Sequence, residues 1–122
     1  MLNHECEKFD KKIDVLLEVN SGEEAGKSGV PPENVESLAR QIQFLPNIRV
    51  LGLMTMGPWV DDPEELRPYF RRTREIFDYV RTLKMQNINM VHLSMGMSDS
   101  YRIAIEEGAT IVRLGTILFG QR

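Results

Sequence analysis

The sequence predicts an α/β protein in which parallel strands alternate with helices as (βα) repeats. Three observations lead to this prediction. Short apolar runs of strand length recur along the chain, amphipathic segments with helical spacing separate them, and each separating segment is long enough for a right-handed crossover. Nearly continuous apolar runs are typical of strands that are covered on both faces, as in a parallel sheet.

Four strands are expected. They lie at about residues 13–20 (IDVLLEVN), 48–56 (IRVLGLMTM), 90–95 (MVHLSM) and 110–114 (TIVRL). Each run is bounded by glycine, proline, serine or asparagine, which favour turns. No low-complexity stretch or linker separates the repeats, so we expect residues 1–122 to form a single, partial barrel domain.

Two longer helices are expected between these strands. The first follows the Pro31-Pro32 pair and stops before Pro46, and the second starts at Asp61 or Asp62 ahead of Pro63, where proline and acidic residues favour a helix N-terminus. Apolar residues recur at helical spacing in both segments. They are Val35, Leu38, Ala39, Ile42 and Leu45 in the first, and Leu66, Tyr69, Phe70, Thr73, Ile76, Phe77, Val80 and Leu83 in the second.

Charge and cysteine content exclude several classes of protein. The net charge of −3 provides no basic field for nucleic acid. Acidic residues at 64, 65, 75 and 78 interleave with the arginines at 67, 71, 72 and 74, which predicts a solvated helix face. The single cysteine excludes an internal disulfide. There is no apolar run of about 18 residues and no segment of signal-peptide type, so we expect a cytoplasmic protein without membrane contact.

Candidate ligand-binding residues follow the last two expected strands. Parallel α/β folds bind ligands outside the carboxyl ends of their strands, and barrels often bind phosphate after the last two. Here the segments 94–98 and 113–116 combine glycines and hydroxyls with a following helical turn. Backbone N–H groups at a helix start donate to anions, Ser98 and Thr116 add hydroxyl donors, and Arg113 adds a permanent positive charge. The pattern therefore indicates an anion site.

Plainer interpretations of the same residues stay open. Gly96 and Gly115 are also suited to simple turns, and Ser98 to a cap of the short helix that ends at Gly108. Arg113 is close in sequence to Glu106 and Glu107, which are possible ion-pair partners. His92 lies inside a strand, where an interior histidine is more common than a catalyst. No spacing of His, Cys, Asp and Glu indicates a metal site, and no catalytic triad or dinucleotide motif is present.

Several motifs resemble one known family. The segments VLLEVNSGEEAGKSGV, GLMTM and HLSMGMSDSYRIAIEEGATIVRLGTILFG are similar to the pyridoxal phosphate homeostasis proteins, whose fold is that of the alanine racemase N-terminal domain. The resemblance extends from about Leu2 to Arg122, and LSMGMSDSY together with VRLGT is its most specific part. It implies the second half, with four strands, of a TIM-type barrel that holds pyridoxal 5′-phosphate (PLP).

The resemblance also implies roles for individual residues. Ser98, Gly115 and Thr116 would hold the phosphate of PLP, and Arg113 would face its pyridine nitrogen. Family members resemble cofactor carriers in vitamin B6 homeostasis, so no catalytic residue and no metal ligand is expected. The family's Schiff-base lysine lies on the first barrel strand and has no equivalent in this chain. Lys27 matches another family position and Lys84 is expected at the far end of a helix, so PLP binding is expected to be non-covalent.

A half-barrel has open sheet edges, which favour pairing with further strands. A whole barrel takes about 250 residues. We therefore expect either a homo-oligomer or association with an N-terminal half. Two other functions remain possible from the sequence: a truncated structural module with a vestigial phosphate loop, and a racemase-like PLP enzyme, which would need an aldimine lysine and a proton-transfer base.

Overall fold

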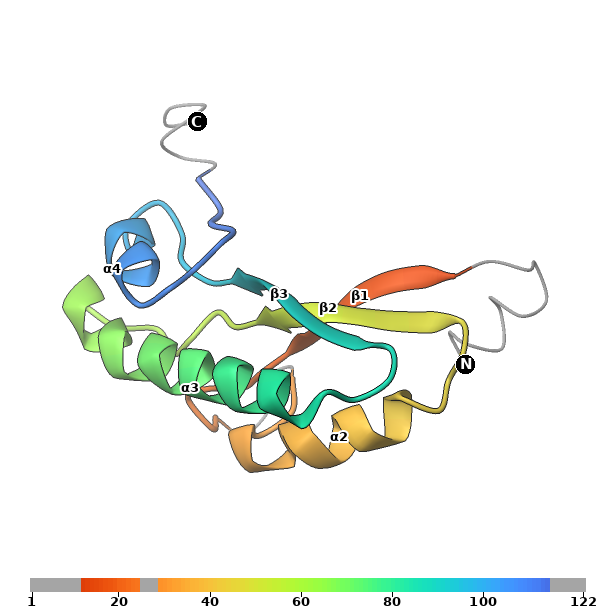
Figure 1. Cartoon of the computed structure of the whole chain (residues 1–122). Helices are drawn as coiled ribbons and strands as arrows, with labels where there is room; N and C mark the ends of the chain where they lie inside the picture. Colours follow the sequence, from red (N-terminus) through yellow and green to blue (C-terminus); the bar gives the residue numbers. More distant parts are fainter. Residues whose placement is uncertain (1–11, 25–28, 115–122) are drawn as a thin grey trace.

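Three parallel strands form the sheet of the computed structural model, which describes residues 12–24 and 29–114. Strands β1 (Ile13–Glu18), β2 (Ile48–Met54) and β3 (Ile88–Ser94) lie in sequence order, with β2 in the centre (Figure 1). The predicted α/β class and three of the four predicted strands are therefore confirmed.

The fourth predicted strand, at residues 110–114, is wrong as a strand. The segment reaches the sheet at one isolated bridge between Ser94 and Ile111. The Met95 N–H donates to the Ile111 carbonyl (3.1 Å), but the Arg113 N–H donates to the carbonyl of Gly96 (3.1 Å), one residue beyond the acceptor in a regular parallel ladder. Gly96 has a φ of 99°, so the chain turns where the ladder would continue.

Both longer helices were predicted, and each begins as a 3₁₀ turn at a proline. Pro32–Asn34 leads into α2 (Val35–Ile42), and Pro63–Leu66 leads into α3 (Arg67–Leu83). Asp62 and Glu65 form a capping box: the Asp62 carboxylate accepts from the Glu64 N–H (3.0 Å), and the Glu65 carboxylate accepts from the Asp62 N–H (3.2 Å). This reciprocal cap explains why the helix starts at the predicted position.

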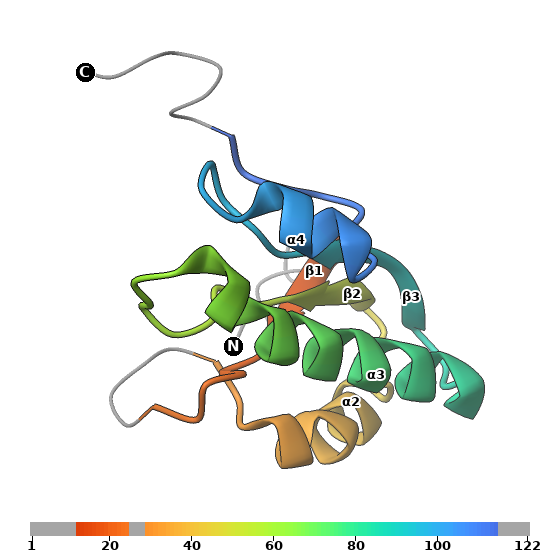
Figure 2. The same ribbon diagram turned by 90° about the vertical axis from the view of Figure 1, so that its left-hand side faces the viewer.

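The core lies between one face of the sheet and helices α2 and α3. Figures 1 and 2 show both helices on this face, while the short helix α4 (Tyr101–Glu106) lies beyond the carboxyl ends of the strands. The fully buried apolar side chains come from both layers, and include Val50, Leu53 and Leu93 of the sheet and Val35, Ala39 and Phe70 of the helices. Burial of such side chains stabilises a fold by roughly 1.5–3 kcal/mol each.

Gly52 lets the central strand approach β3 closely. A Cβ atom at this position would lie 1.7 Å from the carbonyl oxygen of His92. The two strands are out of regular register here, because Gly52 is paired with His92 while Val50 is paired with Ile88. Only a residue without a side chain permits this contact, which brings the carboxyl ends of β2 and β3 together.

The opposite face of the sheet carries no described helix (Figure 1). Asp14 and Arg49 form a bidentate ion pair on it (2.8 and 3.0 Å). A hollow of about 190 Å³ is lined here by Leu51 and His92 together with residues 14–16.

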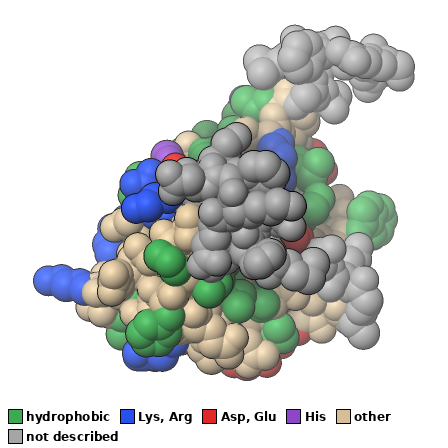
Figure 3. All heavy atoms as spheres, turned by 90° about the vertical axis from the view of Figure 1, so that its right-hand side faces the viewer, with side chains coloured by type: hydrophobic (Ala, Val, Ile, Leu, Met, Phe, Trp, Pro, Cys, Tyr) green, Lys and Arg blue, Asp and Glu red, His purple; other side chains and the backbone are tan. Residues whose placement is uncertain are grey.

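On the side of the molecule shown in Figure 3, lysine and arginine side chains are separated by hydrophobic and other side chains.

Within the described residues, no helix combines the length and the apolar character that are needed to cross a membrane.

Candidate functional site

The carboxyl ends of the three strands meet at one edge of the sheet. The Val19 N–H donates to the Met54 carbonyl (2.7 Å), and the Thr55 N–H donates to the Ser94 carbonyl (3.0 Å). The buried Thr55 hydroxyl donates to the Val19 carbonyl (2.8 Å) and lies 2.7 Å from the Ser21 hydroxyl. Backbone and hydroxyl hydrogen bonds thus join the three strand ends into one surface.

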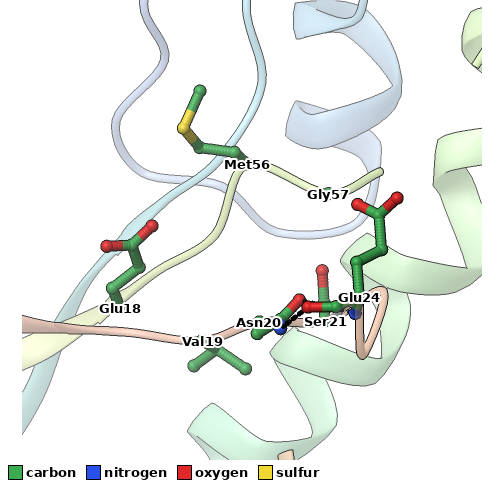
Figure 4. A pocket seen from close by; sticks show the side chains of 7 residues that line it. All are labelled: Glu18, Val19, Asn20, Ser21, Glu24, Met56 and Gly57. Carbon is green, nitrogen blue, oxygen red and sulfur yellow. Dashed lines mark hydrogen bonds between the residues drawn. The ribbon is translucent and has the colours of Figure 1, made fainter. Parts of the chain in front are cut away.

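A cavity of about 150 Å³ opens at the ends of β1 and β2 (Figure 4). Its lining includes Glu18, Asn20, Ser21, Glu24 and residues 56–57. The Asn20 side chain closes the loop over Glu24: its Nδ2 donates to the Glu24 carbonyl (2.8 Å), and its Oδ1 accepts from the Glu24 N–H (3.2 Å). Figure 4 shows the two glutamates on opposite sides, with Asn20 and Ser21 between them. The sequence singled out Asn20 as a strand end and gave no signal for the glutamates.

Ser98 lies in the turn that joins β3 to α4. The sequence offers Ser98, Asp99 and Ser100 as caps of this helix, and the N-cap of α4 is Ser100, whose hydroxyl accepts from the Met97 N–H (3.1 Å). A hollow of about 340 Å³ is lined by the continuous segment 98–103. Ser98 is therefore at the predicted edge of the sheet, beside an accessible concave surface.

Arg113 lies next to this turn. Its backbone N–H donates to the Gly96 carbonyl (3.1 Å), and its Nε and Nη2 atoms are buried with no hydrogen-bond partner among the described residues. The possible ion pair with Glu106 or Glu107 is not formed, because these carboxylates bind Arg67 and Arg71 of α3. Buried hydrogen-bond donors that lack an acceptor destabilise a protein, and a guanidinium cannot lose its charge to relieve this. The two donors of Arg113 are therefore suited to bind an acceptor on a ligand.

Two predicted phosphate ligands, Gly115 and Thr116, lie outside the described residues, as does Lys27. Lys84 forms the C-cap of α3, at the end of that helix away from α4. His92 lines the hollow on the open face of the sheet and does not lie at the strand ends. Of the predicted set, Ser98 lies in the turn after β3, and Arg113 bonds to Gly96 of that turn through its backbone N–H.

Among the described residues, no cluster of three or more His, Cys, Asp or Glu side chains is arranged to hold a metal ion.

The family model of the alanine racemase N-terminal domain matches residues 1–122 of this chain. The chain belongs to the alanine racemase N-terminal domain family. Relatives in this family include the pyridoxal phosphate homeostasis protein of Aquifex aeolicus, which is 54% identical over 109 residues, or 89% of this chain and 47% of the relative. The protein of that name from Pseudomonas aeruginosa is 43% identical over 110 residues, or 90% of this chain and 45% of the relative. The chain spans about half the length of these relatives.

Solved structures agree with membership of the alanine racemase N-terminal domain family. A protein of unknown function from Bifidobacterium adolescentis has a TM-score of 0.91 at 35% identity, over 97% of this chain and 47% of that one. PipY of Synechococcus elongatus with PLP bound has a TM-score of 0.81 at 25% identity, over 98% of this chain and 54% of that one. Alanine racemase of Corynebacterium glutamicum, at 19% identity and a TM-score of 0.70, shows the shared fold alone. The predicted class, a partial barrel of the alanine racemase N-terminal type, is confirmed.

Proposed function

We propose that this protein is a cytoplasmic, non-catalytic PLP-binding protein of vitamin B6 homeostasis. The observation that carries the proposal is Arg113, whose buried Nε and Nη2 have no described acceptor. An aromatic ring nitrogen is an acceptor of suitable size and polarity for one of these donors. The names of the relatives and the PLP-bound relative of similar fold support the same ligand.

In this proposal Ser98, Gly115 and Thr116 hold the phosphate, and Arg113 faces the pyridine nitrogen. PLP supplies an electron sink when it is bound, and the strength of that sink depends on the charge beside its ring nitrogen. A guanidinium stays protonated and therefore leaves the ring nitrogen unprotonated. The residues in question would thus bind and orient PLP while restraining its chemistry, which suits a carrier.

We further propose that the chain corresponds to the C-terminal half of a barrel, and that a second copy or an N-terminal half completes it. The half-length match to the relatives supports this proposal, as do the open face of the sheet and the outer edge of β1, which among the described residues is bridged only at Val30. An unpaired strand edge favours pairing with another strand.

Isothermal titration with PLP and with inorganic phosphate tests the binding proposal. We expect both to bind the wild-type chain, and the double variant Ser98→Ala/Thr116→Ala to lose binding of both. Arg113→Met should weaken PLP and leave phosphate unchanged, because only PLP carries the ring nitrogen. Ser37→Ala/Thr82→Ala is the matched control, since both hydroxyls are exposed and donate to nearby backbone carbonyls, those of Asn34 and Tyr79.

Absence of binding by the wild-type chain would reject the proposal in favour of a structural module. Borohydride treatment with PLP followed by peptide mapping separates the carrier from an enzyme. A carrier without the Schiff-base lysine stays unmodified, whereas one specifically labelled lysine would favour the racemase-like function.

A further inference from the structure

One face of α3 holds the C-terminal end of α4 through arginine side chains. Arg67 and Arg71 are one turn apart and therefore project from the same side of the helix. Arg67 donates to Glu106 (2.6 Å) and Glu107 (2.8 Å), and it also pairs with Glu64 on its own element. Arg71 donates through both Nε and Nη2 to the two carboxylate oxygens of Glu107 (3.1 Å each). Two arginines thus share one carboxylate.

The shared carboxylate is not a solvated surface group. The Glu107 side chain is 11% exposed, and that of Arg67 is 26% exposed. Hydrogen bonds from Arg71, opposed by burial and aided by Arg67, hold the pKa of Glu107 below its usual value. An ion pair that is partly removed from water and bidentate is stronger and more directional than an exposed pair. Arg67 is therefore the exception to the prediction that the arginines of 67–74 form a solvated face.

A third arginine on the same face forms a hydrogen bond to the backbone that follows Glu107. Arg74 Nη1 donates to the Gly108 carbonyl (3.3 Å). Gly108 has a φ of 104°, and α4 ends in a Schellman arrangement, in which the Gly108 N–H donates to Ile105 and the Ala109 N–H donates to Ala104. The end of α4 is thus fixed by its own backbone and by α3.

Helix α4 in turn contacts the site. A Cβ atom on Gly96 would lie 2.6 Å from the Cβ of Ala104, so the turn after β3 packs directly on the middle of α4. The Gly96 carbonyl accepts from the Arg113 N–H (3.1 Å). A continuous series of contacts therefore runs from α3, through Glu107 and α4, to Gly96 and Arg113.

We propose that Arg67, Arg71 and Glu107 form a clamp that positions α4 and, through Gly96, sets the place of Arg113. These three are positioning residues, because none of them lies at the strand ends. This inference rests on the proposed function only in the identity of the ligand that Arg113 binds. The effect of the clamp on the chain before and after α4 does not depend on any ligand.

Amide hydrogen exchange by NMR on the full chain, without ligand, tests the clamp directly. In Glu107→Gln we expect the amides of Met95 and Arg113, which bond to Ile111 and Gly96, to exchange about tenfold faster, as befits loss of charge-assisted hydrogen bonds. The amide of Val50 in the central strand should keep its wild-type rate. The Nε–H resonance of Arg113 should shift as well, a signature that a general loss of stability would not produce.

Glu36→Gln is the matched control. Glu36 pairs with Arg40 (2.6 Å) one turn along α2 and hydrogen-bonds to Tyr79 of α3, so its loss removes polar contacts that do not involve α4. The control should leave the exchange of Met95 and Arg113 unchanged.

Arg71→Met provides a second, milder variant, because Arg71 is 60% exposed and its loss leaves Arg67 on Glu107. We expect the same pattern with a smaller increase. Unchanged exchange at Met95 and Arg113 in both variants would overturn the clamp. So would faster exchange at Val50 in both, since the network would then support the whole fold and not this segment.

PLP titration of the same variants separates this inference from the proposed function. Altered exchange with no PLP binding by wild type would uphold the clamp and reject the PLP-binding proposal. Equal PLP binding by wild type and Glu107→Gln, with unchanged exchange, would reject the clamp alone.

Discussion

Glu107 illustrates how two arginines change the acid–base properties of one carboxylate. The bidentate contact with Arg71 and the further contact with Arg67 stabilise the charged form, and the pKa of Glu107 is therefore lower than its ordinary value of 4.5. Because the folded state binds the proton more weakly than the unfolded state does, the contribution of this group to stability is complete above pH 4.5. It is lost as the pH falls from there through the lowered pKa.

The lowered pKa of Glu107 leads to the first prediction. At neutral pH, Glu107→Gln should have a lower free energy of unfolding than the wild-type chain. The difference should shrink as the pH falls below 4.5, because the wild-type carboxylate becomes protonated there. Urea unfolding across this range measures both curves. A difference that stays constant down to strongly acidic pH would show that Glu107 acts through its shape and not through its charge.

Single residues also mark where sequence reasoning succeeds and where it stops. Gly108 was expected at the end of the short helix and is found there with a positive φ, because helix-ending glycines depend on local backbone geometry. No local pattern marks Gly52 as special within its strand, since the reason for a glycine there is the carbonyl of His92, 40 residues away along the chain. Contacts between distant segments leave no local pattern.

At the scale of elements, α3 supports the irregular strand β3 through one side chain. Arg81, in the last turn of α3, donates from Nε and Nη2 to the Met90 carbonyl (3.3 and 2.9 Å), and its guanidinium lies 4.9 Å from the centre of the Phe77 ring. The register of β2 and β3 shifts at this point, so the side chain satisfies a carbonyl within the shifted stretch. Helix and strand are therefore joined by polar as well as apolar contacts.

The second prediction follows from this contact. Arg81→Met should lower the free energy of unfolding by about 1–3 kcal/mol, since a hydrogen bond from a charged donor and a cation–π contact are both lost. Urea unfolding at neutral pH measures the change. Arg40→Met serves as the control, because Arg40 forms only an exposed pair within α2, worth about 0.3–0.5 kcal/mol. Equal losses in the two variants would contradict a special role of Arg81.

The elements differ in how far the sequence determines them. The starts of the two longer helices were predictable, because Pro32 and the Asp62–Pro63 pair act on the chain next to them. The apolar segment 110–114 satisfied the same strand criteria as the others, yet its described residues form a single isolated bridge to the sheet, at Ile111. Strand formation depends on a partner in register, and the turn at Gly96 shifts that register after Met95.

At the scale of the whole molecule, the sheet is covered by described helices on one face only (Figures 1 and 2). The sequence predicted this incomplete architecture through its family resemblance, and the half-length match to the relatives agrees with it. For the candidate site, the sequence singled out Ser98 and Arg113; the structure describes both beside the turn after β3, and their role as ligands stays a prediction. The arginine contacts behind α4 were not predictable, because charged residues on a helix give no indication of which carboxylate they will meet.

The third prediction concerns association. In sedimentation velocity at micromolar concentration, the wild-type chain should be larger than a monomer, because the open face and the outer edge of β1, bridged among the described residues only at Val30, favour pairing. Leu51→Lys should shift the distribution towards the monomer by placing a charge on that face, where Leu51 lines the hollow. Phe44→Lys is the control: Phe44 is 77% exposed, beyond the end of α2, and the same change there should leave the distribution as in wild type. A monomeric wild type would contradict the prediction.

The hydrogen bonds that join Val19, Ser21 and Thr55 bear on the thermodynamics of any ligand that binds at this edge. Ser21 and Thr55 are almost wholly buried, and their hydroxyls are satisfied within the protein. These strand ends are therefore preorganised, and a ligand would not have to spend binding free energy on ordering them. The entropic penalty of binding would fall on the side chains and turns around the strand ends. Substitutions in those turns should consequently change the entropy of binding more than substitutions in the strands.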